Sequence, residues 1–140
     1  MDIKLTVRSS PNLLCSIRGL VRSYLSNFGI DSDRVDDAVL AVDEACANAI
    51  RHSYEGKADQ EYELTFSSNG EFVDIALKDE GIPAPLDRIE RRELTTPSRD
   101  TLKPGGLGVQ LMYYVFDEVR FVPGEAHGNT VIMRLRRRAL

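Results

Sequence analysis

Hydrophobic and polar positions along the chain predict five strands and three helices. Residues 3–7 alternate between apolar and polar side chains, as expected of a strand with one buried face. Ser10-Pro11 is typical of a helix start, with serine at the cap and proline just inside. Apolar residues then recur at helical spacing as far as Phe28, and Gly29 is placed to end this first helix.

The second predicted helix has the clearest periodicity in the chain. It begins at Asp31 or Ser32 and continues to about Ser53, near Gly56. One apolar stripe runs along it at i, i+3, i+4 and i+7 spacing. The stripe consists of Val35, Ala38, Val39, Val42, Ala45, Cys46, Ala49 and Ile50.

The remaining elements are mostly strands. Two alternating segments, 61–68 and 71–79, flank Asn69-Gly70, a strong hairpin signal. Residues 119–122 and 130–135 predict a closing pair of strands.

The segment between the hairpin and the closing strands differs in character. Residues 82–104 hold four of the six prolines and predict a long loop with one helical turn near 86–91. Loops of this length are uncommon and are usually functional or disordered. Residues 105–108 then open the third helix.

Composition narrows the class of protein. The chain has 140 residues, of which 42% are hydrophobic and 29% charged, and this predicts one globular domain over residues 1–140. A net charge of −4 argues against a general nucleic-acid binder, which would usually be basic. The basic C-terminal residues Arg134, Arg136, Arg137 and Arg138 are interpreted as the solvated end of a strand.

The sequence also bears on location. It has neither a membrane-length apolar stretch nor a secretion signal at its start, so we expect a cytoplasmic protein with no membrane partner. Cys15 and Cys46 lie in helical apolar patterns and are expected to be buried thiols.

Three places carry candidate chemistry, and the first is the polar face of the second helix. Glu44, Asn48 and Arg51 lie at i, i+4 and i+7 and therefore share one face. They offer a carboxylate base, a neutral oxygen ligand and a cation, the mixture that magnesium and phosphate require. The alternative is an ordinary solvated helix face.

The second place is Asp79-Glu80-Gly81. Asp79 continues the parity of Val73, Ile75 and Leu77, so its carboxylate leaves the strand on the core side. A buried carboxylate needs donors, and an exocyclic amine of a base such as adenine is one. Gly81 would let that base approach the backbone. The alternative is a strand end that turns into water.

The third place is Gly105-Gly106-Leu107-Gly108, which precedes a helix. A glycine-rich turn and a helix N-terminus present free N–H groups to an anion. No Lys-Ser/Thr follows the last glycine, so the segment is not a Walker loop, and the dinucleotide spacing is missing as well. The alternative is a flexible hinge.

The order of these motifs resembles the nucleotide-binding superfamily of DNA gyrase, the heat-shock chaperone ATPase and histidine kinases. Within it, the chain is most similar to the RsbW and SpoIIAB anti-sigma factor serine protein kinases. Residues 43–52 resemble the family's N box, 79–81 its first glycine box and 105–112 its second. The resemblance runs from the first strand to Thr130.

The resemblance implies an α+β fold, a two-layer sandwich with helices on one face of a mixed, largely antiparallel sheet. It implies ATP held with Mg²⁺ between the N-box helix and a lid. By position, Asn48 would ligate magnesium, Glu44 would be the catalytic base and Arg51 would lie near the phosphates. The remaining implied nucleotide contacts are Asp79, Gly81, Gly105, Gly106, Leu107, Gly108, Val109 and, least directly, Thr130.

The resemblance also implies the activity. Family members hold a sigma factor inactive and phosphorylate a serine of a small STAS-domain antagonist, and they are often homodimers. Neither partner is a nucleic acid. Pro83 departs from the superfamily, since it replaces the second glycine of Asp-x-Gly-x-Gly, and only Arg99 and Lys103 are candidates to reach a γ-phosphate from the lid.

Two other functions stay open at this stage. One is a binding module that uses nucleotide only to shape a partner surface, against which Glu44 argues because such a module needs no base. The other is the catalytic domain of a two-component histidine kinase. The chain has two histidines, His52 and His127, but no helical hairpin that would carry a phosphorylated one.

Overall fold

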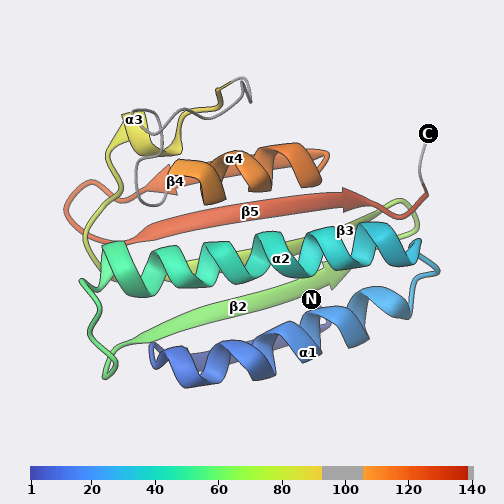
Figure 1. Ribbon diagram of the computed structural model, residues 1–140, viewed down its shortest axis with the longest axis horizontal. Helices are drawn as coiled ribbons and strands as arrows, with labels where there is room; N and C mark the ends of the chain where they lie inside the picture. The colour runs from blue at the N-terminus through green and yellow to red at the C-terminus, as the bar shows by residue number, and fades with distance from the viewer. Residues whose placement is uncertain (93–105, 139–140) are drawn as a thin grey trace.

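The computed structural model describes residues 1–92 and 106–138, which form one antiparallel sheet and a layer of helices (Figure 1). The strands are β1 (Ile3–Arg8), β2 (Glu61–Ser68), β3 (Phe72–Asp79), β4 (Glu118–Pro123) and β5 (Asn129–Arg136). The helices are α1 (Leu14–Ser26), α2 (Ser32–Asn48), α3 (Leu86–Ile89) and α4 (Gly106–Val115), with a 3₁₀ turn η1 (Pro11–Leu13) and a π-helical turn η2 (Ala49–Ser53).

The sheet has the strand order β1-β2-β3-β5-β4, and every pair in the described residues is antiparallel. The predicted α+β two-layer fold is confirmed, but the sheet is not mixed. Between β3 and β5 the chain forms α3, α4 and β4; β5 then pairs with β3 on one side and with β4, the edge strand, on the other. This arrangement brings the ends of β3 and β5 together, with Asp79 opposite Asn129.

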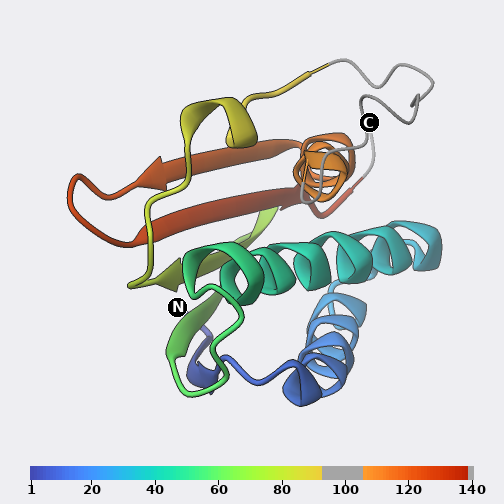
Figure 2. The ribbon, with the colours of Figure 1, turned by 60° about the vertical axis from the view of Figure 1, so that its left-hand side comes forward.

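Helices α1, α2 and α4 pack on one face of the sheet, with α2 in the middle (Figures 1 and 2). The core lies between the two layers, as the alternation predicts. Tyr62, Leu64 and Phe66 of β2 are buried against it, as are Val73 and Ile75 of β3. Burial of the whole apolar core, helix and strand side chains together, supplies most of the driving force for the fold.

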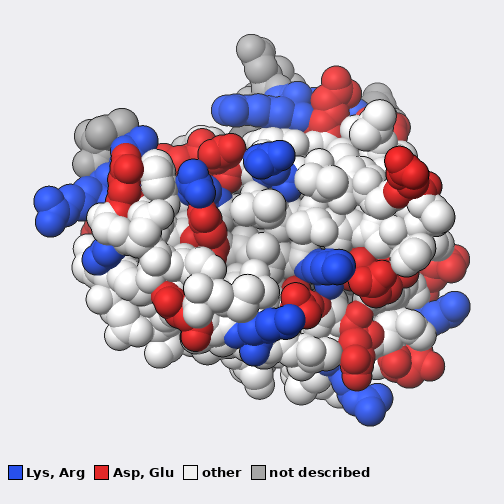
Figure 3. Space-filling model, turned by 180° about the vertical axis from the view of Figure 1, so that it is seen from behind, with Lys and Arg blue, Asp and Glu red and all other residues white. Residues whose placement is uncertain are grey.

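The other face of the sheet is open and carries both signs of charge (Figure 3). Lys4 pairs with Glu63 at 3.6 Å, and Arg134 makes a bidentate contact with Asp74. Two arginines of the C-terminal segment that was predicted to be solvated are therefore in ion pairs, since Arg136 also lies 3.0 Å from Glu71. Exposed pairs of this kind contribute little to stability.

Several local predictions are refined by the structure. Gly29 follows α1 with a φ of +69°, the left-handed conformation that a glycine stop requires. The hairpin forms, but its turn is built on Asn69, whose Oδ1 accepts the N–H groups of Glu71 and Phe72. The prediction that Cys15 is buried is wrong: it lies on the exposed side of α1, whereas Cys46 is fully buried.

No helix among residues 1–92 and 106–138 has both the length and the apolar character needed to span a bilayer.

Candidate functional site

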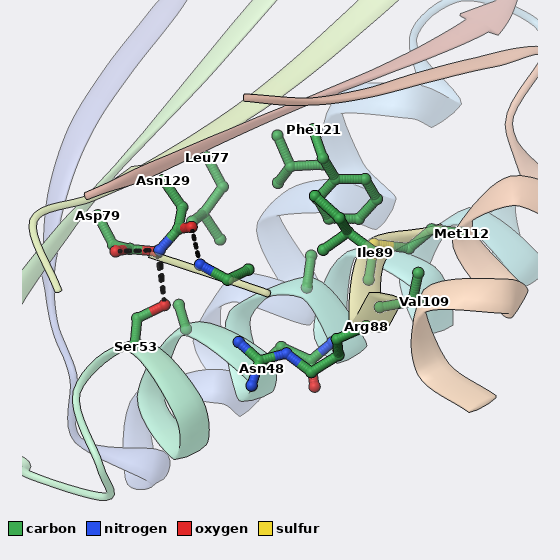
Figure 4. Close-up of a pocket in the computed structure, with 14 residues that line it drawn as sticks. Asn48, Ser53, Leu77, Asp79, Arg88, Ile89, Val109, Met112, Phe121 and Asn129 are labelled. Atoms are coloured by element: carbon green, nitrogen blue, oxygen red, sulfur yellow. Dashed lines mark hydrogen bonds between the residues drawn. The ribbon is translucent and has the colours of Figure 1, made fainter. Parts of the chain in front are cut away.

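A pocket opens between α2, α3, α4 and the adjoining ends of β3 and β5 (Figure 4). The empty space within it, open solvent at its mouth included, is about 440 Å³. Its walls are largely apolar, and its polar lining residues are Asn48, Ser53, Asp79, Arg88 and Asn129.

Asp79 lies at one end of this pocket, where β3 ends. Its residue exposure is only 2%, as the strand parity predicts. Asp79 Oδ1 accepts the N–H of Gly81 at 2.9 Å, and Oδ2 accepts the hydroxyl of Ser53 at 3.0 Å. Burial raises the pKa of Asp79, while hydrogen bonds from Asn129, Gly81 and Ser53 act in the opposite direction.

Asn129 connects the polar side chains around Asp79 by hydrogen bonds, and it was not among the residues predicted from the sequence. Its Nδ2 donates to Asp79 Oδ1 and Ser53 Oγ, both at 3.1 Å, and to the carbonyl of Ile82 at 2.9 Å. Its Oδ1 accepts the N–H of Ala84 at 2.7 Å. One side chain therefore joins β5, β3, η2 and the loop after β3.

Thr130, which the sequence predicts to contact the base, is not among the described residues that line this pocket. Successive side chains of a strand point to opposite faces, and the pocket is lined by Asn129 and Val131. Thr130 therefore lies on the open face of the sheet, with Ile132 and Arg134. The site residue is its neighbour Asn129, which follows Gly128 with its φ of +86°.

The predicted polar face of α2 is assembled beside the pocket, around Asn48. Asn48 lines the pocket, and its Oδ1 accepts a hydrogen bond from Arg51 at 3.2 Å. Arg51 also lies 3.9 Å from Glu44. Carboxylate, amide and guanidinium are thus neighbours, although Arg51 itself is mostly exposed.

The last turn of the predicted second helix is a π-helical turn. In η2 the chain widens over residues 49–53, a feature that often occurs at functional sites. The turn brings Ser53 beneath the end of β3, where its hydroxyl reaches Asp79 and its carbonyl oxygen accepts the N–H of Ile82 at 2.8 Å.

Helix α4 brings the second glycine motif to the same pocket. Gly106 is its first residue, Val109 lines the pocket, and Leu107 is exposed. Gly108 faces Glu44 so closely that a Cβ there would lie 3.2 Å from the carboxyl carbon of Glu44 and closer still to Oε2. Gly105, Arg99 and Lys103 lie outside the described residues.

Gly81 has a different reason to be glycine from the one expected. A Cβ at this position would overlap the carbonyl oxygen of Ser53 and lie 2.5 Å from its carbonyl carbon. The close approach is therefore between β3 and η2 and is internal to the protein. Gly128 donates its N–H to the carbonyl of Gly81 at 2.6 Å, which fastens the same corner.

Donor and acceptor chemistry of the pocket fits an adenine nucleotide with magnesium. Asp79 receives three donors, whereas a carboxylate has about four lone-pair positions, so it can accept one more N–H. Asn48 Oδ1 is an oxygen of the kind that Mg²⁺ takes from proteins while it keeps phosphate and water ligands. Among the described residues, no three His, Cys, Asp or Glu side chains gather as a metal site.

Comparison with protein families gives one matching model, the histidine kinase-like ATPase domain, over residues 7–135. The serine-protein kinase RsbW of Bacillus subtilis is 33% identical over 122 residues, which cover 84% of this chain and 76% of that protein. The anti-sigma F factor of Bacillus cereus is 26% identical over 114 residues, covering 81% and 77%.

Two solved structures share the fold. The SiaB–SiaC complex of Pseudomonas aeruginosa contains a chain with a TM-score of 0.68 and 14% identity, with 96% of this chain and 89% of that one aligned. The RsbU and RsbW domains of a Mycobacterium tuberculosis protein give 0.61 and 19%, covering 96% of this chain and 31% of theirs.

Proposed function

The chain belongs to the histidine kinase-like ATPase domain family and, within it, to the RsbW serine-protein kinases, and we propose that its pocket binds ATP with Mg²⁺. The chain is a protein-serine kinase of the anti-sigma regulatory type. One observation carries the nucleotide proposal: Asn48, Asp79 and Val109, from three separate segments, line the same pocket.

The polar residues of the three sequence motifs have defined roles in this proposal. Asp79 accepts the amino group of adenine with its remaining lone pair, and Asn48 ligates the magnesium ion with Oδ1. Arg51 and the N–H groups at the start of α4 neutralise phosphate charge. Bound ATP supplies the phosphoryl group, and Glu44 takes the proton from the serine hydroxyl.

The proposed partners follow from the relatives. We infer that the chain binds a sigma factor and phosphorylates a serine of a STAS-domain antagonist, which then loses its hold. The cytoplasm is the proposed location because sigma factors act there. We propose that residues 1–140 form one domain and that two copies associate as a homodimer, which sedimentation would test.

Thermal melting with and without Mg-ATP tests the nucleotide site. A ligand at about 100 times its dissociation constant should stabilise the protein by about 2.7 kcal/mol. The shift should vanish in Asp79→Ala and persist in Glu80→Ala, which removes an exposed neighbouring carboxylate. An equal shift in all three proteins would contradict the assignment of Asp79.

Phosphoryl transfer from γ-labelled ATP to antagonist proteins tests the kinase itself. Glu44→Ala should bind nucleotide but transfer about 100-fold or more slowly. Asp37→Ala, on the exposed side of the same helix, is the matched control and should transfer normally. Transfer by Glu44→Ala at the wild-type rate would remove Glu44 as the base, and nucleotide binding without any transfer would favour the binding-module alternative.

A further inference from the structure

Arg88 is a pocket residue to which neither the motifs nor the proposed roles assign a task. It belongs to α3, the short helix that follows the first glycine box, and it lines the pocket together with its neighbour Ile89. Figure 4 shows its side chain extending from α3 across the pocket on the side of Asn48. The residue is half-buried, so its guanidinium is only partly hydrated.

The position of α3 is fixed by α4. Tyr113 donates its hydroxyl to the carbonyl of Ile89 at 2.6 Å. Gln110, which is buried, donates Nε2 to the carbonyl of Glu90 at 2.8 Å and accepts the N–H of Arg92 at 2.7 Å with Oε1. These three bonds hold the backbone at the C-terminal end of α3, and the bond from the N–H of Ala84 to Asn129 Oδ1 holds it on the N-terminal side, so Arg88 lies on a segment that is anchored at both ends.

The charge of Arg88 lacks a compensating contact within the described residues. No hydrogen bond or ion pair joins its guanidinium to any of them, whereas Arg51 has Asn48 and Glu44 as neighbours. Burial lowers the pKa of Arg88, and the charges of Asp87 and Asp79 only oppose this effect from a distance. A partly desolvated cation without a partner costs free energy unless a ligand supplies the anion.

The chemistry of a nucleotide identifies which of its groups could supply this anion. Adenine and ribose are neutral, so only the phosphates can neutralise a guanidinium, and arginine binds phosphate oxygens well. The polar end of the pocket at Asp79 is occupied by Ser53 and Asn129, while Arg88 lies toward the Asn48 side. We propose that Arg88 binds a phosphate of the nucleotide and thereby makes the pocket prefer nucleotides over nucleosides.

This inference rests on the proposed nucleotide site, and it is tested by calorimetric titration of wild type, Arg88→Ala and Arg88→Lys with ADP and with adenosine. Arg88→Ala should weaken ADP binding by about 10- to 100-fold, the worth of one charge-assisted hydrogen-bonded contact. Adenosine binding should stay within about threefold, because adenosine lacks the group that Arg88 contacts. Arg88→Lys should recover part of the loss because it keeps the charge without the planar fork.

Arg91→Ala is the matched control. Arg91 is an exposed arginine three residues further along, near the ring of Tyr113 and outside the pocket, so its removal lowers the net charge equally. It should leave ADP affinity unchanged. Without nucleotide, Arg88→Ala should melt at the wild-type temperature or higher, since it removes a half-buried charge that no other described residue pairs with.

Three results would overturn the inference in distinguishable ways. Wild type that binds neither ADP nor adenosine would remove the proposed nucleotide site along with it. Unchanged ADP affinity in Arg88→Ala, with wild-type binding intact, would overturn only the role of Arg88. An equal loss for ADP and adenosine would show that Arg88 shapes the pocket as a whole and does not contact a phosphate.

Discussion

Alanine at Gly108 is the most direct test of how α4 and α2 meet. Gly108 faces Glu44, and an added Cβ would lie 3.2 Å from the carboxyl carbon of Glu44 and closer to Oε2. That carboxylate is the far end of a flexible side chain, so it can move away by about 1 Å to an ordinary contact distance. The added Cβ would also lie 3.3 Å from the Cβ of Glu44, which needs only a small adjustment between α2 and α4. The mutation therefore displaces mainly the proposed base.

The expected effects on rate and stability differ sharply. A displacement of about 1 Å at a catalytic group can cost about 100-fold in rate. Stability should change by no more than about 1 kcal/mol, because alanine is preferred to glycine in a helix by about that amount and offsets the side-chain shift. We therefore expect a melting temperature within about 4 °C of wild type.

Gly81→Ala provides the contrast. Its Cβ would lie 2.5 Å from the carbonyl carbon of Ser53, which is backbone and cannot swing aside. The hydrogen bond from Ile82 to Ser53 would also be lost. Overpacking and the lost hydrogen bond together should lower the free energy of unfolding by about 2–4 kcal/mol.

The assay measures single-turnover phosphoryl transfer at saturating Mg-ATP, together with thermal melting of both variants. Gly108→Ala should be folded, bind nucleotide within about threefold of wild type and transfer slowly. Gly81→Ala should melt at a lower temperature than wild type, whatever its transfer rate. Full transfer by Gly108→Ala would refute Glu44 as the base, and a melting loss equal to that of Gly81→Ala would show that Gly108 serves packing.

Three further predictions concern the buried polar groups. Asn129→Ala should lower the free energy of unfolding by about 2–3 kcal/mol in urea titrations, because it leaves buried partners unsatisfied. Thr130→Ala should change it by less than about 0.5 kcal/mol. A larger loss in Thr130→Ala than in Asn129→Ala would contradict the register of β5. Because burial raises the pKa of Asp79, its contribution to stability is present below the ordinary value of 3.8 and is lost as pH rises through the raised value. Asp79→Asn should reduce that loss in urea titrations between pH 3 and pH 7, about the range over which a carboxyl with a raised pKa titrates. A pH profile of stability equal to that of wild type would count against the burial of Asp79. Burial lowers the pKa of His52, and the charge of Arg88 lowers it further. Arg88→Ala should therefore raise the pKa of His52 in an NMR titration. An unchanged pKa would show that Arg88 does not lie near η2.

Elements that depend on local pattern were predicted well. The apolar stripe of α2 and the alternation of β2 and β3 follow directly from helical and strand geometry. The parity of β3 also placed Asp79 on the core side, because that inference needs only the period of two along one strand. The sequence order of the motifs was sufficient for the family, which the histidine kinase-like ATPase match over residues 7–135 confirms.

Features that depend on contacts between distant segments were not predictable. Thr130 and Asn129 are adjacent, and a one-residue error reverses which face of the sheet a side chain occupies. The closeness of Gly81 to Ser53 arises between residues 28 positions apart, and no local pattern records it. Arg88 lies in a proline-rich segment without periodicity, so only the folded structure reveals that it lines the pocket.

The part of the pocket around Asp79 is more preorganised than the part around Asn48, and this difference suggests an order in which contacts to a ligand form. At one end, Asp79, Ser53 and Asn129 hold one another in place, so a base that enters there finds its acceptor already oriented and costs little reorganisation. Around Asn48, Arg51 already donates to Oδ1, so a metal ion would take the second lone pair of that oxygen or displace Arg51, and no described residue supplies an anion to Arg88. Adenine should therefore be bound by a preformed site, while the phosphates and magnesium rearrange the face of α2 that also holds Glu44.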